Sequence, residues 1–380
     1  MRDGEPLVER MRGFGTTIFA EMSALATATG SVNLGQGFPD TDGPPEILAA
    51  AATAIHDGHN QYPPGMGVPE LRQAIGAHQL RRYGLDVDPD REVLVTAGAT
   101  EAIAAALLAL AGPGDEVILF EPYYDSYAAS VALAGAERRT VTIERDGAGW
   151  GFDPAALNAA VTARTKAIVL NTPHNPTGTV FSPDELAAVA DVATKHNLVV
   201  IADEVYEHLL FDGRTHTPIA TLPGMRERTV TISSAGKTFS VTGWKIGWAS
   251  GPAELIAAVR TVKQFLTYVN GAPFQPAVAQ VLPMAEKLAP AAALEAQRDL
   301  LCDGLARLGY DVIRPQATYF ATVDVKRDAV EFCRELPRRA GVVAIPSSVF
   351  YDSDAGDHFV RFAFCKRPEV LTEALERLGR

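Results

Sequence analysis

The chain has 380 residues, of which 47% are hydrophobic and 21% are charged, and its net charge at pH 7 is -12. This length exceeds the usual size of a single domain, so we expect a large domain and a second, smaller one, each with its own core. The composition is that of a folded globular protein, and the acidic balance, with no Lys/Arg cluster, argues against a nucleic-acid partner.

The cysteines and the apolar runs indicate where the protein works. Cys302, Cys333 and Cys365 lack a CxxC pair and the spacing of metal ligands, so we expect free thiols in a reducing compartment and no metal site. The charged N-terminus is unlike a secretory signal, and the longest apolar run, 102–111, is too short to span a bilayer. A cytoplasmic protein without a membrane partner is therefore expected.

Short apolar runs alternate with helical patterns through the middle of the chain. The predicted strands are 92–96, 116–120, 166–170, 198–202 and 229–233. Two segments between them, 100–111 and 183–196, have helix composition and helix stop signals. This alternation predicts an α/β fold with a mainly parallel sheet between helices.

The pattern changes near residue 277. A long helical stretch continues to about residue 308, and short strands follow near 319–325 and 359–364. These elements predict a smaller α+β domain, joined by the N-terminal segment. The expected division is a large domain over 36–275 and a small domain formed by 1–35 and 276–380.

A first candidate motif, Gly98-Ala99-Thr100-Glu101, lies between a predicted strand and a helix. Ligands of open α/β sheets collect at the carboxyl ends of strands, and the free N–H groups of a helix start can hold a phosphate there. Taken alone, the motif is more typical of a strand-to-helix turn in which Thr100 caps the helix.

A second candidate is Asp203, directly after the predicted strand 198–202. A carboxylate there is unfavourable to bury unless a cation or a strong donor faces it, and a protonated pyridine nitrogen is such a partner. The alternative is an aspartate that caps the next turn. Asn175, in the string NTPHNPTG, suits donation to a phenolate oxygen, or it serves the turn itself.

A third candidate is Lys237, which ends the small-residue string SSAGK after the predicted strand 229–233. A lysine can form an imine when its surroundings lower its pKa, and Lys245, eight positions later, supplies a nearby cation. Most lysines are merely solvated, so Lys237 becomes a candidate only through the motifs around it.

Together these motifs resemble the fold-type I enzymes that use pyridoxal 5'-phosphate (PLP), and specifically the class I/II aminotransferases, over nearly the whole chain. The strings NLGQGFPD, NQYPPG, DEVYEHL and SAGKTFSVTGWKIGW are similar to the branch with kynurenine aminotransferase, glutamine transaminase K and bacterial methionine aminotransferase. Within it the chain most resembles the actinobacterial N-succinyldiaminopimelate aminotransferases. The resemblance implies the PLP-dependent transferase fold, with a seven-stranded type of sheet in the large domain.

The resemblance also implies the residues that bind PLP. Lys237 would hold it covalently, Asp203 would face the pyridine nitrogen, and Tyr206 with Asn175 would bond the 3'-oxygen. Tyr124 would stack on the ring. The residues implied around the phosphate are Gly98, Ala99, Thr100, Ser234, Lys245 and, from the neighbouring subunit, Tyr62. A homodimer with shared active sites follows from the same resemblance.

Substrate binding is implied at Arg361, which would clamp the α-carboxylate together with the Gly37 backbone and Asn175. The alternative is an exposed strand arginine in an ion pair. Phe19 would lie over the substrate, where some relatives carry Trp, or in the core. The segment 268–276, which the partner subunit supplies in the family, contains no arginine, so aspartate is not expected as the main donor.

The implied reaction is ping-pong transamination between amino-acid and 2-oxo-acid substrates, with 2-oxoglutarate as acceptor. The expected donor is N-succinyl-LL-2,6-diaminopimelate, which would place the enzyme in lysine biosynthesis. Kynurenine, glutamine and methionine are alternatives, and a cysteine-conjugate β-lyase side activity is another. A PLP-binding transcription regulator is not expected, because the chain offers no basic DNA-binding module.

Overall fold

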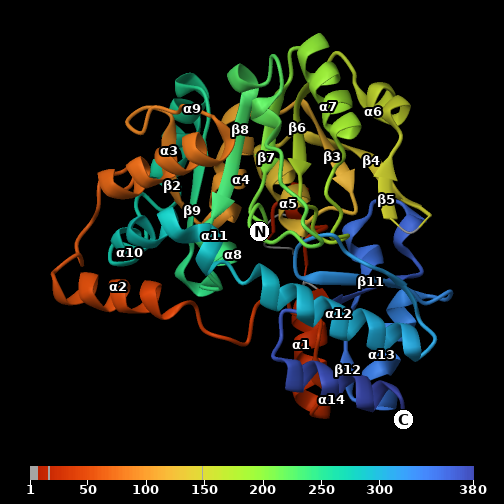
Figure 1. Ribbon diagram of the computed structural model, residues 1–380. Helices are drawn as coiled ribbons and strands as arrows, with labels where there is room; N and C mark the ends of the chain where they lie inside the picture. The colour runs from red at the N-terminus through yellow and green to blue at the C-terminus, as the bar shows by residue number, and fades with distance from the viewer. Residues whose placement is uncertain (1–6, 16–17, 148) are drawn as a thin grey trace.

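The computed structural model describes residues 7–15, 18–147 and 149–380. Its central feature is an eight-stranded sheet with helices on both faces, beside a smaller antiparallel sheet (Figure 1). Residues 1–6, on which the prediction of an N-terminus without a secretory signal partly rests, lie outside the described residues, as does part of the predicted segment 1–35.

The large sheet confirms the predicted strands and their mainly parallel pairing. In spatial order the strands are β2 (Val93–Ala97), β9 (Ile246–Ser250), β8 (Thr229–Ser234), β7 (Val199–Asp203), β6 (Thr165–Asn171), β3 (Glu116–Glu121), β4 (Glu137–Asp146) and β5 (Gly149–Phe152). β9 runs antiparallel to both of its neighbours, and β5 runs antiparallel to β4. The remaining pairs are parallel, so the carboxyl ends of β3, β6, β7 and β8 meet at one edge.

Strand side chains alternate between two helix layers. Val117 and Leu119 of β3 pack in a core with α4 (Gly98–Leu110), α5 (Asp125–Ala134) and α9 (Ala253–Leu266). Ile118 and Phe120 point to the opposite core, covered by α6 (Pro154–Ala160) and α7 (Pro183–Lys195). A strand buried on both faces needs this continuous apolar pattern, which is why the sequence predicted it correctly.

A second group of helices covers the β2 end of the sheet. It consists of α2 (Pro45–His56), α3 (Pro69–Tyr83), α8 (Ala235–Thr238), α10 (Phe274–Val281) and α11 (Ala285–Leu288). Val278 and Leu282 share a core with Ile47 and Leu71. The predicted boundary at 275/276 therefore falls inside an α10 that packs on α2 and α3, and the division into two domains stays a prediction.

The helical stretch predicted from 277 to 308 as one run is instead divided. α10 ends at Val281, and α12 (Ala291–Arg307) begins only after Pro290. Pro283 and Pro290 interrupt the run because proline lacks the N–H that a helix interior requires.

The smaller sheet has the order β10 (Asp311–Ile313), β11 (Phe320–Asp324), β14 (Phe359–Ala363) and β13 (Ile345–Pro346). α12, α13 (Ala329–Ala340) and α14 (Pro368–Leu378) accompany it. The N-terminal α1 (Ile18–Thr29) lies beside α13 and α14 in Figure 1, and β1 (Val32–Asn33) pairs with β12 (Val342–Val343). The segment from α1 to β1 thus packs with the C-terminal part of the chain in this region.

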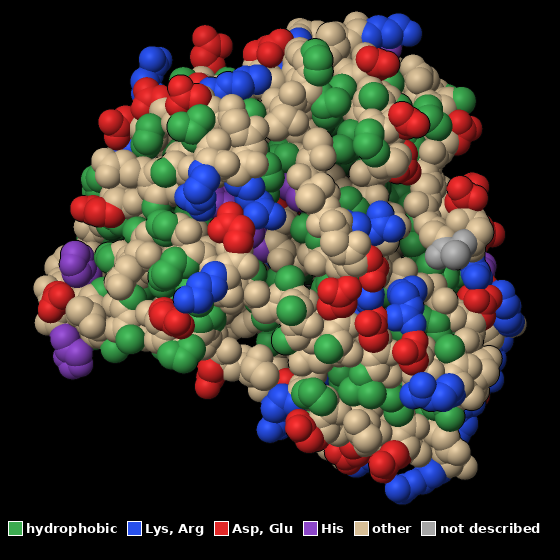
Figure 2. All heavy atoms as spheres, in the orientation of Figure 1, with side chains coloured by type: hydrophobic (Ala, Val, Ile, Leu, Met, Phe, Trp, Pro, Cys, Tyr) green, Lys and Arg blue, Asp and Glu red, His purple; other side chains and the backbone are tan. Residues whose placement is uncertain are grey.

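Short 3-10 helices occupy Glu9–Met11, Ile219–Thr221, Arg226–Arg228, Thr242–Trp244, Leu282–Met284, Ser347–Phe350 and Asp354–Gly356. None of the described helices combines the length and the apolar character that a membrane crossing requires. On the face shown in Figure 2, acidic and basic side chains are interspersed and form no single basic patch.

Candidate active site

A pocket of about 360 Å³ lies where the carboxyl ends of the central strands meet β14 and the segment after α1. Its volume is within the usual range for a small-molecule site. The sequence-predicted residues that line it are Phe19, Gly37, Gly98, Ala99, Thr100, Tyr124, Asn175, Asp203, Tyr206, Ser234, Lys237, Lys245 and Arg361. The fold thus brings together residues that lie far apart in the chain, from Phe19 to Arg361.

One end of the pocket is built for an anion. α4 begins at Gly98, whose φ of +74° suits glycine, and the preceding Ala97 makes no side-chain cap, so Thr100 is not the cap. A Cβ at position 98 would lie 3.1 Å from Lys245 Nζ, so the glycine allows this amine to approach the helix start. The N–H groups of the first turn, together with Lys245 and Ser234 in the same pocket, favour a phosphate.

Asp203, the last residue of β7, is a carboxylate buried in the middle of the site. It is 5% exposed, its Oδ2 accepts a hydrogen bond of 2.5 Å from the Tyr127 hydroxyl, and its Oδ1 accepts from Val205 N at 3.4 Å. Burial raises the pKa of Asp203 to about 6, and the Tyr127 bond opposes this rise. With no Lys or Arg bonded to it among the described residues, the carboxylate is suited to a ligand N–H.

Lys237 lies on α8, and its Nζ is 5.4 Å from the centre of the Tyr206 ring and 5.1 Å from that of Tyr319. The pKa of Lys237 is lowered to about 8, mainly by burial. The charges of Arg361 and Lys245 also lower this pKa, and Asp203 raises it. About a tenth of this amine is therefore unprotonated at pH 7, far more than for an ordinary lysine, and this fraction can act as a nucleophile or base.

Arg361, on β14, is a buried cation that meets no carboxylate among the residues described. It is 2% exposed, and it donates to Asn175 Oδ1 at 3.2 Å and to the Gly35 carbonyl at 3.3 Å. Its buried Nε has no hydrogen-bond partner. Three rings surround its Cζ: Phe320 at 4.0 Å, Phe350 at 4.9 Å and Phe19 at 5.2 Å. Such a guanidinium, facing a pocket, is a receptor for a carboxylate.

Two predicted residues differ in detail from the expectation. The backbone contact of Arg361 is with Gly35, whereas Gly37 lines the pocket, where a Cβ would lie 2.4 Å from the Phe320 ring. The turn role considered for Asn175 belongs to Asn171, whose side chain accepts from Asn175 N at 2.8 Å and donates to the Asp203 carbonyl at 2.8 Å. Asn175 is thereby left to contact Arg361.

Tyr62 is not brought into the pocket of its own chain. Its side chain is 82% exposed, and its ring meets that of Tyr268 edge-on at 5.7 Å. An aromatic residue so exposed is available to another molecule, but its role stays a prediction.

Sequence reasoning missed three contributors to the site. Tyr127, three residues after Tyr124, bonds Asp203, and Phe320 stacks on Arg361. Asp125 lines the pocket, and burial raises the pKa of its carboxyl. The spacing of Tyr124 and Tyr127 along one helical turn was the available signal for Tyr127; Phe320 has none, because β11 meets Arg361 only through sheet pairing.

Comparisons with known proteins agree with this arrangement. The family model for aminotransferase class I and II matches residues 29–378. A Mycobacterium tuberculosis protein named as a probable N-succinyldiaminopimelate aminotransferase is 56% identical, with 98% of each chain covered. The solved structure of the M. tuberculosis enzyme has a TM-score of 0.95 and covers 98% of this chain and 99% of its own. Methionine aminotransferase from Escherichia coli is 40% identical over 98% of each chain.

These structural matches confirm the predicted fold class, a large mixed and mainly parallel sheet between helices with a smaller antiparallel sheet. The large sheet has eight strands rather than seven because β5 extends the edge beyond β4. β4, β5 and β9 were not predicted. The glycine and tryptophan residues of β9 lie within the motif string and do not form an apolar strand pattern, and charged residues interrupt such a pattern in β4.

The pKa of Asp203 generates a stability prediction for Tyr127→Phe. A folded-state pKa of about 6 is above the unfolded value of about 4, so ionising Asp203 destabilises the fold increasingly as pH rises between them. Because a bond to an ionised carboxylate is the stronger one, the variant should lose about 2 kcal/mol of unfolding free energy at pH 8 and about 1 kcal/mol at pH 5. Urea unfolding of PLP-free protein measures both.

Tyr123→Phe is the matched control. Tyr123 donates to Asp352, whose pKa is lowered and which also pairs with Arg138, so this carboxylate stays ionised at both pH values. The control should show the same loss at pH 5 and pH 8. Equal losses for Tyr127→Phe at the two pH values would contradict the account of Asp203.

Proposed function

The chain belongs to the aminotransferase class I and II family, and we propose that it transfers the amino group of N-succinyl-LL-2,6-diaminopimelate to 2-oxoglutarate. As an aminotransferase it is an enzyme of amino acids and 2-oxo acids. The choice of donor is supported by the 56% identity, over 98% of both chains, to the M. tuberculosis relative of that name. This donor would place the enzyme in lysine biosynthesis.

The observation in the pocket that best supports amino-group transfer is the environment of Arg361. Arg361 is buried, has an unpartnered Nε, and faces a pocket that also contains Lys237 and Asp203. An α-amino acid donor and a 2-oxo acid acceptor both have an α-carboxylate, and a planar guanidinium binds this group with two hydrogen bonds. A single carboxylate receptor beside an amine of lowered pKa is what amino-group transfer requires.

Class I and II aminotransferases use PLP, and the residues present fit this cofactor. The Gly98–Thr100 helix start, with Lys245 and Ser234, suits its phosphate. Asp203, which lacks a basic partner among the described residues, suits its pyridine N–H. The rings of Tyr124 and Tyr206 line the pocket between these two ends. In the proposed roles Tyr124 stacks on the ring, while Tyr206 and Asn175 donate to the 3'-oxygen.

When bound, PLP supplies an electrophilic aldehyde and a ring that takes up electron density from the substrate α-carbon. Lys237 binds the cofactor through Nζ and afterwards moves the proton at the substrate α-carbon, for which its pKa of about 8 is suitable. Asp203, ionised above about pH 6, accepts the pyridine N–H. Arg361 holds the substrate carboxylate so that the α-hydrogen faces Lys237.

Because donor and acceptor share an α-carboxylate, Arg361 would bind the two in turn, which corresponds to a ping-pong mechanism. The segment 268–276 contains no arginine, so the distal carboxylate of aspartate would lack a partner from it. Phe19 and Phe320 instead give the substrate side of the pocket an aromatic lining. These features favour a larger donor than aspartate.

We also propose a homodimer with shared active sites. Tyr62 and its neighbour Tyr268 are exposed to 82% and 52%, and Phe265 at the end of α9 is exposed to 83%. Exposed aromatic residues clustered on one surface are typical of a protein interface. In the proposed dimer Tyr62 reaches the phosphate site of the neighbouring subunit.

Lys237→Ala should abolish covalent attachment of PLP and turnover, because Lys245, the other lysine among the described pocket residues, lies at the phosphate end. Mass spectrometry after borohydride reduction measures the attachment. Lys245→Ala is the control, since it removes only a phosphate contact: attachment should persist with about ten- to a hundred-fold weaker PLP affinity. Full turnover in Lys237→Ala would refute the assignment.

Arg361→Ala should retain PLP but raise KM for the donor by about a hundred-fold, the effect of losing roughly 3 kcal/mol of charged hydrogen bonding. Arg361→Lys should recover part of this loss, because it keeps the charge and not the planar fork. Steady-state kinetics measure both. An unchanged KM in Arg361→Ala would remove the carboxylate contact from the mechanism.

A panel of donors with 2-oxoglutarate tests the proposed substrate. We expect kcat/KM for N-succinyl-LL-2,6-diaminopimelate to exceed those for kynurenine, glutamine, methionine and aspartate by at least about ten-fold. Parallel lines in double-reciprocal plots should accompany this preference. A higher kcat/KM for methionine or kynurenine would reassign the donor without affecting the reaction class.

A further inference from the structure

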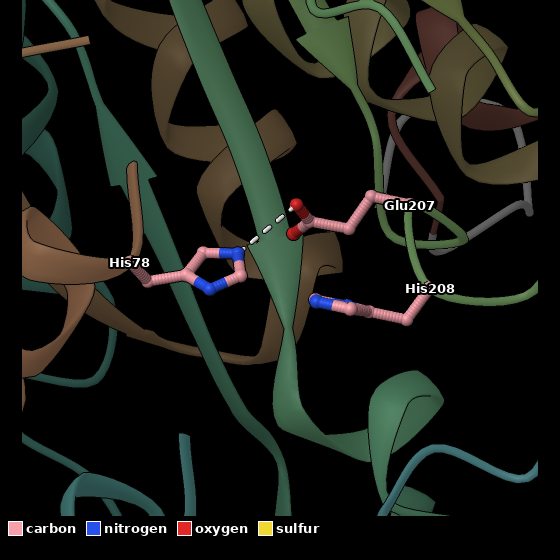
Figure 3. A group of neighbouring side chains, drawn as sticks. All are labelled: His78, Glu207 and His208. Atoms are coloured by element: carbon pink, nitrogen blue, oxygen red, sulfur yellow. Dashed lines mark hydrogen bonds and ion pairs between the residues drawn. The ribbon is translucent and has the colours of Figure 1, made fainter. Parts of the chain in front are cut away.

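Outside the pocket, three buried side chains of metal-binding type point toward one another. They are His78 of α3, and Glu207 and His208 of the segment after β7 (Figure 3). Each offers one ligand atom, and these atoms lie within 4.8 Å of one another. All three residues are at least nine-tenths buried, with exposures of 0%, 1% and 6%.

Glu207 is a buried anion. Among the described residues, His78 is the one basic side chain that bonds its carboxylate. Its Oε1 accepts from Ser233 Oγ at 2.6 Å, and its Oε2 accepts from the Tyr83 hydroxyl at 2.5 Å and from His78 Nε2 at 3.3 Å. Buried charges in proteins are paired with an opposite charge or coordinate a metal.

His208 presents an unused lone pair to the same space. Its Nδ1 lies 3.2 Å from Thr238 Oγ1, and that hydroxyl donates its single proton to the Ser234 carbonyl at 3.3 Å. Thr238 must therefore accept from His208 Nδ1–H, which leaves Nε2 as an acceptor. This buried Nε2 has no hydrogen-bond partner. An acceptor in that position calls for a cation or a donor.

The protonation of His78 can adapt to a metal. Arg81, which can only donate, lies with Nη2 3.4 Å from His78 Nδ1, so the proton of the neutral ring is on Nε2 and is directed at Glu207. A metal at Nε2 requires this proton to move to Nδ1. Arg81 is 44% exposed and 3.7 Å from Glu286, so it can turn to that carboxylate instead.

We propose that His78 Nε2, a Glu207 carboxylate oxygen and His208 Nε2 bind one Zn²⁺ per chain. Two imidazoles and a carboxylate are a common zinc ligand set, with Zn–N and Zn–O distances of about 2.1 Å. Given separations within 4.8 Å, inward movements of roughly 0.5 Å per ligand produce this geometry. Ser233, Tyr83 and Thr238 act as the outer partners that orient the ligands.

The site has a structural role rather than a catalytic one. It ties α3 to the segment that follows Tyr206, and through Ser233 and Thr238 it reaches both sides of Lys237. Metal binding therefore stabilises the strand end and the short helix that present the catalytic lysine. Arg82, whose Nη2 donates to the Glu207 carbonyl at 3.5 Å, has its charge paired with Glu286 at 3.2 Å.

The test uses the holoenzyme, treated with a chelator and then titrated with Co²⁺, which replaces Zn²⁺ and absorbs visible light. We expect one equivalent of Co²⁺ per chain with the visible bands of a low-coordinate nitrogen-oxygen site, displaced by Zn²⁺. His208→Gln, which keeps a donor for Thr238, should weaken binding at least about a hundred-fold, whereas His56→Gln should not, because His56 is exposed on α2. Circular dichroism checks that both variants are folded.

Thermal unfolding of the wild-type enzyme provides a second test of Zn²⁺ binding. Zn²⁺ at a large excess over its Kd should raise the thermal midpoint of the chelator-treated enzyme by a few degrees, because it binds only the folded state. Glu207→Gln, which keeps the shape and loses the charge, should remove this rise. Absence of Co²⁺ uptake by the wild-type enzyme, or uptake unchanged in both His208→Gln and Glu207→Gln, would overturn the proposal.

Discussion

The binding capacity of the pocket depends most on charged groups that are buried at the carboxyl edge of the central sheet without opposite charges beside them. Arg361 has an unpartnered Nε, and Asp203 has only neutral donors. With a pKa of about 6, ionised Asp203 destabilises the fold by about 3 kcal/mol near neutral pH. A substrate carboxylate beside Arg361 and a pyridine N–H beside Asp203 would supply the missing partners. Preorganised charges of this kind supply much of the electrostatic stabilisation that an active site gives to its ligand.

Sheet topology is what brings these groups together. β6 and β7 pair in register so that Asn171 lies opposite Asp203, and Asn171 then fixes the turn that leaves Asn175 free to contact Arg361. Arg361 comes from β14 in the smaller sheet, where its Cα faces Thr322 of β11. The pocket is therefore formed between two sheets, and the position of one relative to the other determines whether the carboxylate receptor faces the lysine.

A contrast in hydrogen bonding distinguishes the pocket from the polar cluster behind it. In the pocket the charged side chains keep free capacity directed at a ligand, whereas Glu204 is bonded by the His216 imidazole and the Ile219 backbone. Glu207 accepts from two hydroxyl groups and from His78, and it lies beside the unpartnered Nε2 of His208. The two regions share the segment that runs from Asp203 to His208. Asp203, Val205 and Tyr206 line the pocket, whereas the side chains of Glu204, Glu207 and His208 form the polar cluster behind it.

The sequence alone was sufficient to predict the alternating strands and helices, the parallel sheet, and the pocket residues that belong to recognisable strings. These features depend on apolar periodicity and small-residue turns, which involve residues close together in the chain. The sequence did not reveal β4, β5 or β9, the breaks near Pro283 and Pro290, or the bond from Tyr127 to Asp203. It also predicted no metal ligands, since His78 and Glu207 are 129 positions apart. Contacts between distant segments depend on how the sheets and helices pack, and only the tertiary structure decides which buried groups meet.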